Sequence, residues 1–179
     1  MQLARSAGFR TDGVEIAPEL ACEAARRYGL RVHTGNLSNA PSHLRGYDVV
    51  TAWDVLEHCP DPHLVIQEVA RRMLPGGLVL LRVPDFSFAS RGLPPDFVKR
   101  YLGGMYPLDP DQHALHFTPE ALSLVLEAHG LEVLEAWGSQ ADEYTPKSLP
   151  GYAELLVAMD QHGVHCEFAV LARKLTGAG

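Results

Sequence analysis

A cluster of titratable side chains follows a run of β-branched residues in the segment 47–62, which reads YDVVTAWDVLEHCPDP. The run DVVT has little polar alternation, as is typical of a strand that is covered on both faces. Asp54, Glu57, His58 and Cys59 come directly after it. An imidazole titrates near neutral pH, so His58 can serve as a general base, whereas no adjacent basic residue activates Cys59 as a nucleophile. The alternative interpretation is a capped strand-to-helix turn with ordinary surface charges.

The elements on either side of this cluster explain why it could form a site. Asp61 and Pro62 predict a helix over 63–73, with Asp61 as the N-cap. Ligands of open α/β sheets bind outside the carboxyl ends of the strands, which is where the cluster falls. Strands and helices alternate along the chain, and this favours parallel strands with crossover helices. We expect strands within 9–16, 30–33, 48–51 and 78–83, a tight turn at 74–77, and helices at 17–28, 63–73 and 118–129.

The second half of the chain departs from this alternation in two places. Residues 86–117 are rich in proline and aromatic residues, and their apolar positions have no clear periodicity. This favours a lid over the site. The alternative is that the aromatic side chains of this segment complete the core. A strand at 131–137, a loop at 139–150, a helix at 152–162 and a strand at 164–174 follow. The close pair of final strands predicts an antiparallel edge strand on a mostly parallel sheet.

Composition excludes several classes of protein. The 179 residues carry a net charge of −7, which argues against non-specific binding to nucleic acid or to an anionic membrane. No run approaches the roughly 20 apolar residues of a membrane span, and the polar start MQLARSAGF does not resemble a secretory signal. The three cysteines are widely spaced, which predicts a reduced, cytoplasmic protein.

Five motifs, in this order and spacing, resemble class I S-adenosylmethionine-dependent methyltransferases, and most closely the small-molecule branch that includes the ubiquinone-type O-methyltransferases. The motifs are VEIAPE, GNL, YDVVTAWDVLEH with its trailing PDP, LPGGLVLLRVPD and HFTPEALSLVLEAHGLEV. The resemblance implies an α/β fold with a Rossmann-like doubly wound, mostly parallel sheet and an antiparallel edge strand. It also implies a single domain over 1–179, with the lid at 86–117.

One part of the family pattern is not found in the sequence. The family's first strand and its glycine-rich loop should precede residue 1, and no GxGxG occurs in the chain. We therefore expect that the N-terminal strand is missing and that the domain is N-terminally truncated. The explanations are a truncated gene product, a misplaced start codon or a fragment. The strands that end at Glu15 and near Ala52 would then have unpaired edges.

The resemblance implies that S-adenosylmethionine contacts residues that follow three strands: Glu15, Ile16, Asn36, Leu37, Ala52 and Trp53. Glu15 would accept hydrogen bonds from the ribose hydroxyls, and its alternative is a solvated strand end. Asn36 would accept a bond from the adenine amine, and its alternative is an ordinary turn residue. Trp53 would lie along the methionine part of the cofactor, unless it is a core aromatic.

The implied function is methyl transfer from S-adenosylmethionine to a small-molecule acceptor, with O-methylation favoured and with His58 and His113 as candidate catalytic bases. Asp54, Glu57 and His58 resemble a pattern that is associated with a divalent metal in the ubiquinone-type enzymes. We expect no metal site, because one local triplet rarely suffices. The alternatives are a non-catalytic, methyltransferase-like remnant that binds a partner and no cofactor, and metal-dependent hydrolysis by the histidine-rich loop.

Overall fold

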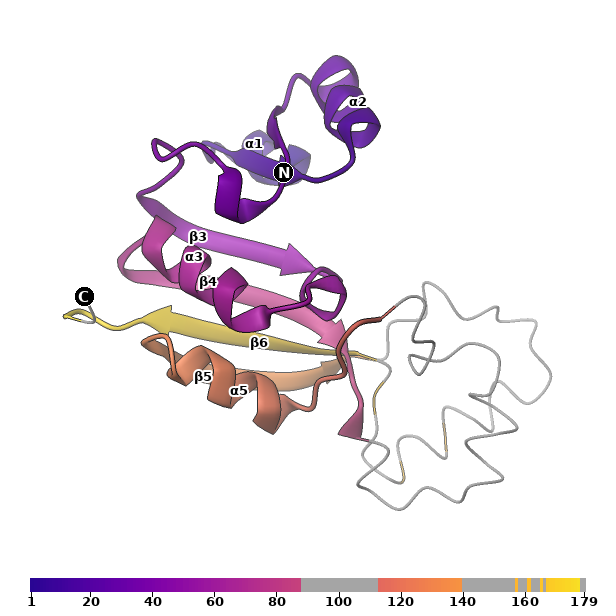
Figure 1. The fold of residues 1–179 in the computed structure, drawn as a ribbon, viewed down its shortest axis with the longest axis vertical. Coiled ribbons are helices and arrows are strands. Elements are labelled where there is room, and N and C mark those ends of the chain that lie inside the picture. The colour runs from indigo at the N-terminus through magenta and orange to yellow at the C-terminus, as the bar shows by residue number, and fades with distance from the viewer. Residues whose placement is uncertain (88–112, 140–156, 158–160, 162–164, 166, 178–179) are drawn as a thin grey trace.

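The structure is a computed structural model that describes residues 1–87, 113–139, 157, 161, 165 and 167–177 (Figure 1). Most of the predicted lid, of the loop at 139–150 and of the helix at 152–162 lies outside the described residues. The elements are α1 (Gln2–Ser6), β1 (Asp12–Glu15), α2 (Pro18–Tyr28), β2 (Arg31–Thr34), the 3₁₀ helix η1 (Leu37–Asn39), β3 (Tyr47–Trp53), the 3₁₀ helix η2 (Leu56–His58), α3 (Pro62–Arg72), β4 (Met73–Pro84), α5 (Pro119–Glu127), β5 (Leu131–Ser139) and β6 (Glu167–Lys174).

The predicted starts of α3 and α5 and the predicted end of α2 are confirmed, whereas α3 ends at Arg72 and α5 at Glu127, slightly before the residues expected. Gly29 ends α2 in the left-handed conformation, with φ of 60°, which glycine adopts without a steric penalty. The Asp61 carboxylate accepts a hydrogen bond from the Leu64 amide at 3.1 Å, at the start of α3. The Thr118 hydroxyl likewise accepts from the Ala121 amide at 3.2 Å, at the start of α5. Each contact satisfies a backbone donor that the first turn of a helix leaves without a partner.

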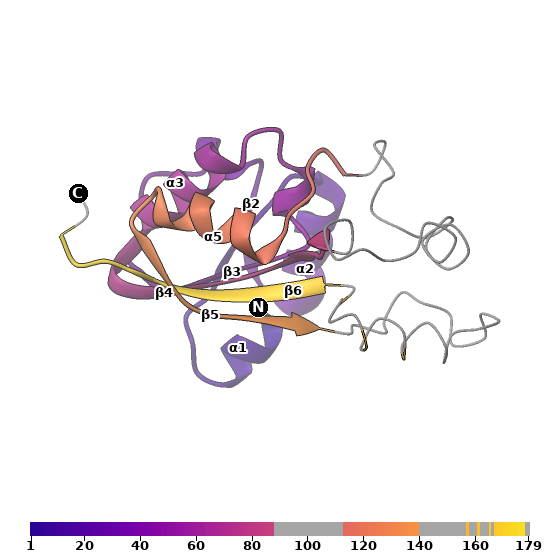
Figure 2. The ribbon, with the colours of Figure 1, turned by 90° about the horizontal axis from the view of Figure 1, so that it is seen from below.

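The described strands form two sheets, and their pairing confirms the mostly parallel fold with an antiparallel edge. One sheet has the order β1-β2 and the other β3-β4-β6-β5. The pairs β1–β2 and β3–β4 are parallel, whereas β6 runs antiparallel to both β4 and the edge strand β5. In Figure 2, α3 and α5 lie together on one face of the larger sheet.

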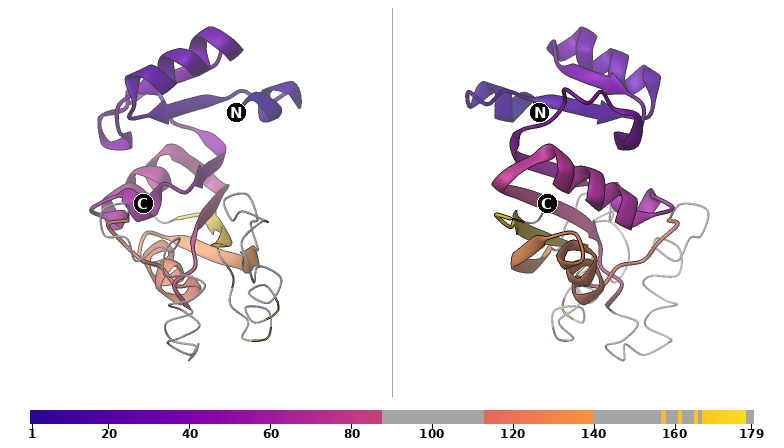
Figure 3. Two further views of the ribbon diagram at one scale, coloured as in Figure 1. Left: turned by 90° about the vertical axis from the view of Figure 1, so that its right-hand side faces the viewer. Right: turned by 60° about the vertical axis from the view of Figure 1, so that its left-hand side comes forward.

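The larger sheet does not pair with β1 or β2 among the strands that the structure describes. Neither β1 nor β3 has a second hydrogen-bonded neighbour among the strands that the structure describes. A side-chain bridge spans the separation, because the Tyr47 hydroxyl donates to the Asp12 carboxylate at 3.1 Å. Tyr47 and Asp12 begin β3 and β1, so the amino ends of these two strands lie on facing sides of the gap (Figures 1 and 3).

The turn expected at 74–77 is part of β4 instead of preceding it. Tyr47 is paired with Met73, but Val49 is already paired with Leu78, so the intervening residues of β4 bulge out of the ladder. Gly76 has a φ of 79°, which lets the bulge turn back into the strand. The sequence signal for a turn was correct, and the strand continues on both sides of it.

The core lies between the larger sheet and the helices α3 and α5. Its most deeply buried members are large apolar side chains from both layers: Ile66, Val79, Leu81, Val83, Leu122, Leu126, Leu131, Phe168 and Val170. Burying each such side chain contributes about 1.5–3 kcal/mol, so this layer holds α3 and α5 against β4, β5 and β6. No helix in the described part of the chain is both long enough and apolar enough to cross a membrane.

A buried arginine ties the segment 37–44 to α3. The Arg72 guanidinium donates to the carbonyls of Leu37, Ala40, Pro41 and Leu44 at 2.8–3.1 Å, and it also contacts the Glu68 carboxylate at 3.3 Å. Its planar fork of donors suits several acceptors at once. The segment that follows β2, and with it Leu37, is therefore held against the C-terminal end of α3 by one side chain.

Candidate functional site

The chain turns sharply where β3 ends, and Asp54 occupies this turn. Its φ of 53° lies in the left-handed region, which Asp tolerates better than most residues and which occurs often at functional sites. The backbone amide of Asp54 donates to the Arg82 carbonyl at 3.0 Å, and its carboxylate pairs with the Arg82 guanidinium. Arg82 also lies 3.2 Å from the Glu167 carboxylate and 5.5 Å from the centre of the Trp53 ring.

Glu57 is the most unusual side chain near this turn, because it is only 2% exposed. Neither of its carboxylate oxygens has a hydrogen-bond partner among the residues that the structure describes. Burial raises the pKa of Glu57, an effect that the nearby His58 and Arg82 partly oppose. The His58 imidazole lies beside it, with Nε2 3.8 Å from Oε1 of Glu57.

The described C-terminal end of the predicted lid, from residue 113 to 117, brings a second histidine to this point. The Leu115 amide donates to the Glu57 carbonyl at 3.0 Å, and the Phe86 amide donates to the Phe117 carbonyl at 2.8 Å. These backbone bonds hold His113 beside His58, with ring centres 5.0 Å apart. The structure therefore places the two predicted catalytic histidines together, although they are far apart in the sequence.

Glu57, His58 and His113 have a donor set that a metal ion could use. Each offers one ligand atom, and the three atoms lie within 4.8 Å of one another. The buried Glu57 carboxylate, which accepts no hydrogen bond in the described region, is the kind of ligand that a cation would satisfy. A divalent ion at such a site supplies Lewis acidity, which lowers the pKa of a coordinated hydroxyl. These residues therefore fit the divalent metal ion that the resemblance implied, with His113 as a further possible ligand.

Two of the residues expected to bind the cofactor lie at the carboxyl end of β1, where Glu15 is the last residue of the strand and Ile16 follows it. Glu15 is partly buried, and its Oε1 accepts a hydrogen bond from the Ala17 amide at 2.8 Å, so this carboxylate orders the turn into α2. Ile16 is 71% exposed. One carboxylate oxygen of Glu15 therefore has a structural role, and the other accepts no hydrogen bond from the described residues.

The remaining expected cofactor residues lie just after β2 or at the carboxyl end of β3. Asn36 is exposed, and its side-chain oxygen accepts from the Ser38 hydroxyl at 3.3 Å, whereas Leu37 packs against the core. Ala52 also packs against the core, but Trp53 is half exposed on the other face of β3. Trp53 is therefore not part of the core that the described residues form, which excludes the alternative given for it above.

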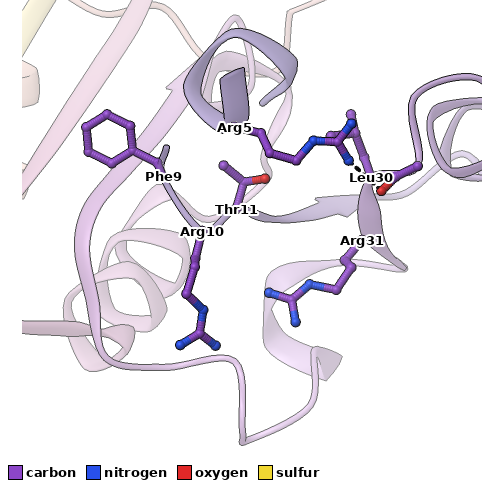
Figure 4. A pocket seen from close by; sticks show the side chains of 7 residues that line it. Arg5, Phe9, Arg10, Thr11, Leu30 and Arg31 are labelled. Carbon is purple, nitrogen blue, oxygen red and sulfur yellow. Dashed lines mark hydrogen bonds between the residues drawn. The ribbon is translucent and has the colours of Figure 1, made fainter. Parts of the chain in front are cut away.

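A pocket of about 280 Å³ lies elsewhere in the molecule (Figure 4). Its lining residues are Arg5, Phe9, Arg10, Thr11, Gly29, Leu30 and Arg31. These residues come from α1 and from just before or at the start of β1 and β2. The expected cofactor residues follow the carboxyl ends of the same strands, so this pocket is separate from the candidate site.

Two charged residues near Asp54 were not predicted from the sequence: Arg82, which pairs with Asp54, and Glu167, which pairs with Arg82. A sequence signal for Arg82 was present, because it is the single charge within the apolar run LVLLRV. A charge is rarely placed on a buried strand without a partner. Glu167 offered no comparable signal, since its contact with Arg82 depends on the antiparallel pairing of β4 with β6.

Comparisons with known proteins agree with this architecture. Residues 1–136 match the family model described as a methyltransferase domain. The ubiquinone biosynthesis O-methyltransferase of Shewanella sp. (strain ANA-3) is 32% identical over 116 residues, which cover 59% of this chain and 47% of the relative. The chain spans about half the length of the curated relatives it matches.

Solved structures show the same fold. A SAM-dependent methyltransferase from Methanosarcina mazei superposes with a TM-score of 0.66 at 23% identity, covering 97% of this chain and 85% of that one. A second match is geranyl diphosphate C-methyltransferase from Streptomyces coelicolor A3(2), solved with Mg²⁺, geranyl diphosphate and S-adenosyl-L-homocysteine. Its TM-score is 0.67 at 14% identity, and the match covers 97% of this chain and 65% of that one. The match of the family model over most of the sequence shows that the chain belongs to the class I methyltransferases, whose cofactor is S-adenosylmethionine.

Proposed function

We propose that this chain transfers a methyl group from S-adenosylmethionine to a hydroxyl group of a small-molecule acceptor. The observation that carries the proposal is the cluster of Glu57, His58 and His113 next to the carboxyl end of β3. Ligands of open α/β sheets bind at this end of the strands. The O-methyltransferases among the relatives support a hydroxyl acceptor over a nitrogen or carbon acceptor.

The chemistry requires alignment more than activation. The methyl carbon leaves the sulfonium sulfur and bonds to the acceptor oxygen, S-adenosylhomocysteine is released, and the hydroxyl proton must be accepted. A sulfonium is already a good leaving group, so the main task of the protein is to hold the acceptor oxygen, the methyl carbon and the sulfur in line.

The residues of the cluster can take the proton. His58 is about half exposed and can reach an acceptor, and an imidazole is a suitable base near neutral pH. The Glu57 oxygen at 3.8 Å would stabilise the imidazolium that forms. Glu15 and Asn36 would hold the ribose and the adenine through the oxygens of their side chains.

The proposal is tested by measuring transfer of a radiolabelled methyl group from S-adenosylmethionine to a panel of phenols and aliphatic alcohols. We expect His58→Gln and His113→Gln to lower turnover about 100-fold or more, with the cofactor dissociation constant unchanged. His129→Gln is the matched control, because His129 lies just after α5 and its ring contacts that of His63 instead of the cluster. Turnover that is equally insensitive to all three substitutions would show that the histidine cluster does not accept the proton.

A second candidate is a methyltransferase-like protein that binds a partner and no cofactor. The gap between β1 and β3 favours it, because the expected cofactor residues lie on both sides of that gap. Calorimetric titration with S-adenosylmethionine separates the two. Binding with a micromolar dissociation constant supports catalysis, and no heat at millimolar cofactor supports the non-catalytic alternative.

A further inference from the structure

We propose that the pocket in Figure 4 binds a small anion that carries a phosphate group. The pocket has a volume of about 280 Å³ and lies at the amino ends of β1 and β2. It is therefore about 10 Å from the expected cofactor residues, which lie at the carboxyl ends of these four-residue strands. The proposal does not depend on methyl transfer, so its test requires no turnover.

The first argument is the charge of the pocket. Arg5, Arg10 and Arg31 line it, and no acidic residue is among the described residues that do so. Arg31 pairs with the Asp12 carboxylate at 2.9 Å, but Arg5 and Arg10 have no carboxylate partner in the described part of the chain. The pocket is therefore cationic, although the whole chain has a net charge of −7. A concave surface lined by one sign of charge concentrates ions of the opposite sign.

The second argument is the number of hydrogen-bond donors that remain for a ligand. Each guanidinium carries several N–H donors in a rigid fork. Arg5 donates through two of its nitrogens to carbonyls at the end of α2, and Arg31 through one nitrogen to a carboxylate. Neither the Arg10 guanidinium nor the Thr11 hydroxyl makes a hydrogen bond to any residue that the structure describes. Donors from all four side chains are therefore available to an anion in the pocket.

The third argument is that part of the pocket wall is already held in position. The Arg5 guanidinium, from α1, donates to the Gly29 carbonyl at 2.7 Å and also to the Tyr28 carbonyl. The last turn of a helix leaves such carbonyls without an intrahelical partner, so Arg5 ties α1 to the end of α2. Leu30 also lines the pocket and is only 9% exposed. A side chain that is ordered before binding costs less entropy when a ligand arrives.

The arrangement of the arginines favours a phosphate group over a carboxylate. Figure 4 shows the side chains of Arg10 and Arg31 extending in the same direction, so one ligand can approach both forks. A guanidinium fork fits the oxygens of either group. A phosphate monoester carries a charge of about −1.5 to −2 near pH 7 on three terminal oxygens, whereas a carboxylate carries a single charge on two. Only the phosphate therefore offers enough oxygens on one centre for more than one guanidinium.

The test is calorimetric titration of the full chain with glycerol 3-phosphate, inorganic phosphate and succinate, in chloride at constant ionic strength. The pocket is slightly smaller than the range of about 300–1,000 Å³ that is typical of small-molecule sites, so a phosphate monoester of a few carbon atoms is the suitable probe. We expect one equivalent of glycerol 3-phosphate to bind, more tightly than inorganic phosphate or succinate, and glycerol to give no heat. Succinate is the comparison because it carries a similar charge on two separate carboxylates.

Arg10→Gln should weaken the binding of glycerol 3-phosphate about tenfold or more, as expected for the loss of a charge-assisted hydrogen bond. Arg10 is exposed and contacts no described side chain, so its replacement should leave the fold intact. Arg71→Gln is the matched control, because it removes the same charge from a 71% exposed arginine on α3 that does not line the pocket. Glu15→Gln should also leave this affinity unchanged, since Glu15 lies at the other end of β1.

Modification by phenylglyoxal, which reacts with exposed guanidinium groups, locates the anion on the unsubstituted chain. Glycerol 3-phosphate at about ten times its dissociation constant should slow the modification of Arg10 about tenfold, because only about one molecule in eleven is then unliganded. Mass spectrometry of the peptides should show no change at Arg71.

Several results would overturn the proposal. No binding of either phosphate, or equal losses for Arg10→Gln and Arg71→Gln, would show that the pocket is not an anion site. Equal protection of Arg10 and Arg71 from phenylglyoxal would show the same without any substitution. Succinate binding as tightly as glycerol 3-phosphate would refute the choice of a phosphate group, and inorganic phosphate binding as tightly would refute a monoester as the ligand. A tenfold loss in Glu15→Gln would place the anion at the cofactor residues instead of in this pocket.

Discussion

Replacing Arg72 by methionine should destabilise the protein far more than the same change at its neighbour Arg71. The Arg72 guanidinium makes four hydrogen bonds of 2.8–3.1 Å to carbonyls of the segment 37–44, and the residue is only 9% exposed. A hydrogen bond to a charged group contributes about 1.5–3 kcal/mol, but bonds that share one donor group are not additive. We expect a loss of about 3–5 kcal/mol in the free energy of unfolding, as for other broken buried ionic contacts.

The assay is urea denaturation followed by circular dichroism, together with the melting temperature. For a domain of this size, the expected loss lowers the melting temperature by about 10 °C. Arg71 is the control, because it lies on the same helix and pairs with the same Glu68, but its side chain is 71% exposed. Arg71→Met should cost less than about 1 kcal/mol. Equal losses for the two variants would show that the carbonyl contacts of Arg72 contribute little.

Two further predictions concern side chains near the candidate site. Glu15→Gln should weaken S-adenosylmethionine binding about tenfold in calorimetric titration, because an amide makes weaker bonds to ribose hydroxyls than a carboxylate does. The control Glu19→Gln should have no effect. If both variants bind the cofactor with the same affinity, Glu15 is only a turn residue. Burial and the Glu57 carboxylate raise the pKa of Cys59, so less thiolate is present at pH 8 and iodoacetamide should modify Cys59 more slowly than the exposed Cys22. Mass spectrometry of the labelled peptides measures both rates, and faster modification of Cys59 would contradict this account.

Local signals in the sequence were sufficient for the elements and their order. The caps at Asp61 and Thr118 and the glycine after α2 are decided by contacts between near neighbours, so the residue types alone predicted them. The gap next to β1 was predicted from a motif that the sequence does not contain. The helix caps and the gap could therefore be predicted from sequence motifs, without knowledge of how the elements pack.

The composition of the candidate site could be predicted only in part. Glu57 and His58 are adjacent in the sequence, but the approach of His113 depends on the Leu115–Glu57 backbone bond, which joins segments more than fifty residues apart. The same is true of Arg82 with Glu167, which meet because β4 and β6 are antiparallel neighbours. Periodicity does not reveal contacts between distant segments, and the burial of Glu57 follows from these contacts.

The separation of β1 from β3 has a consequence for how the molecule opens. Amides on the facing edges of these strands have no ladder partner in the described residues, so they should exchange with deuterium much faster than amides in the interior strand β4. The Tyr47–Asp12 bond is a contact between partly buried side chains, and it cannot couple the unfolding of the two sheets as a continuous ladder would. The unit β1-α2-β2 should therefore behave as a separate foldon that opens at lower free energy than the unit built on β3, β4, β6 and β5. Any strand that pairs with both β1 and β3 would join the two foldons into one cooperative structure. Slower deuterium exchange of the amides on these two edges would show that such a strand is in place.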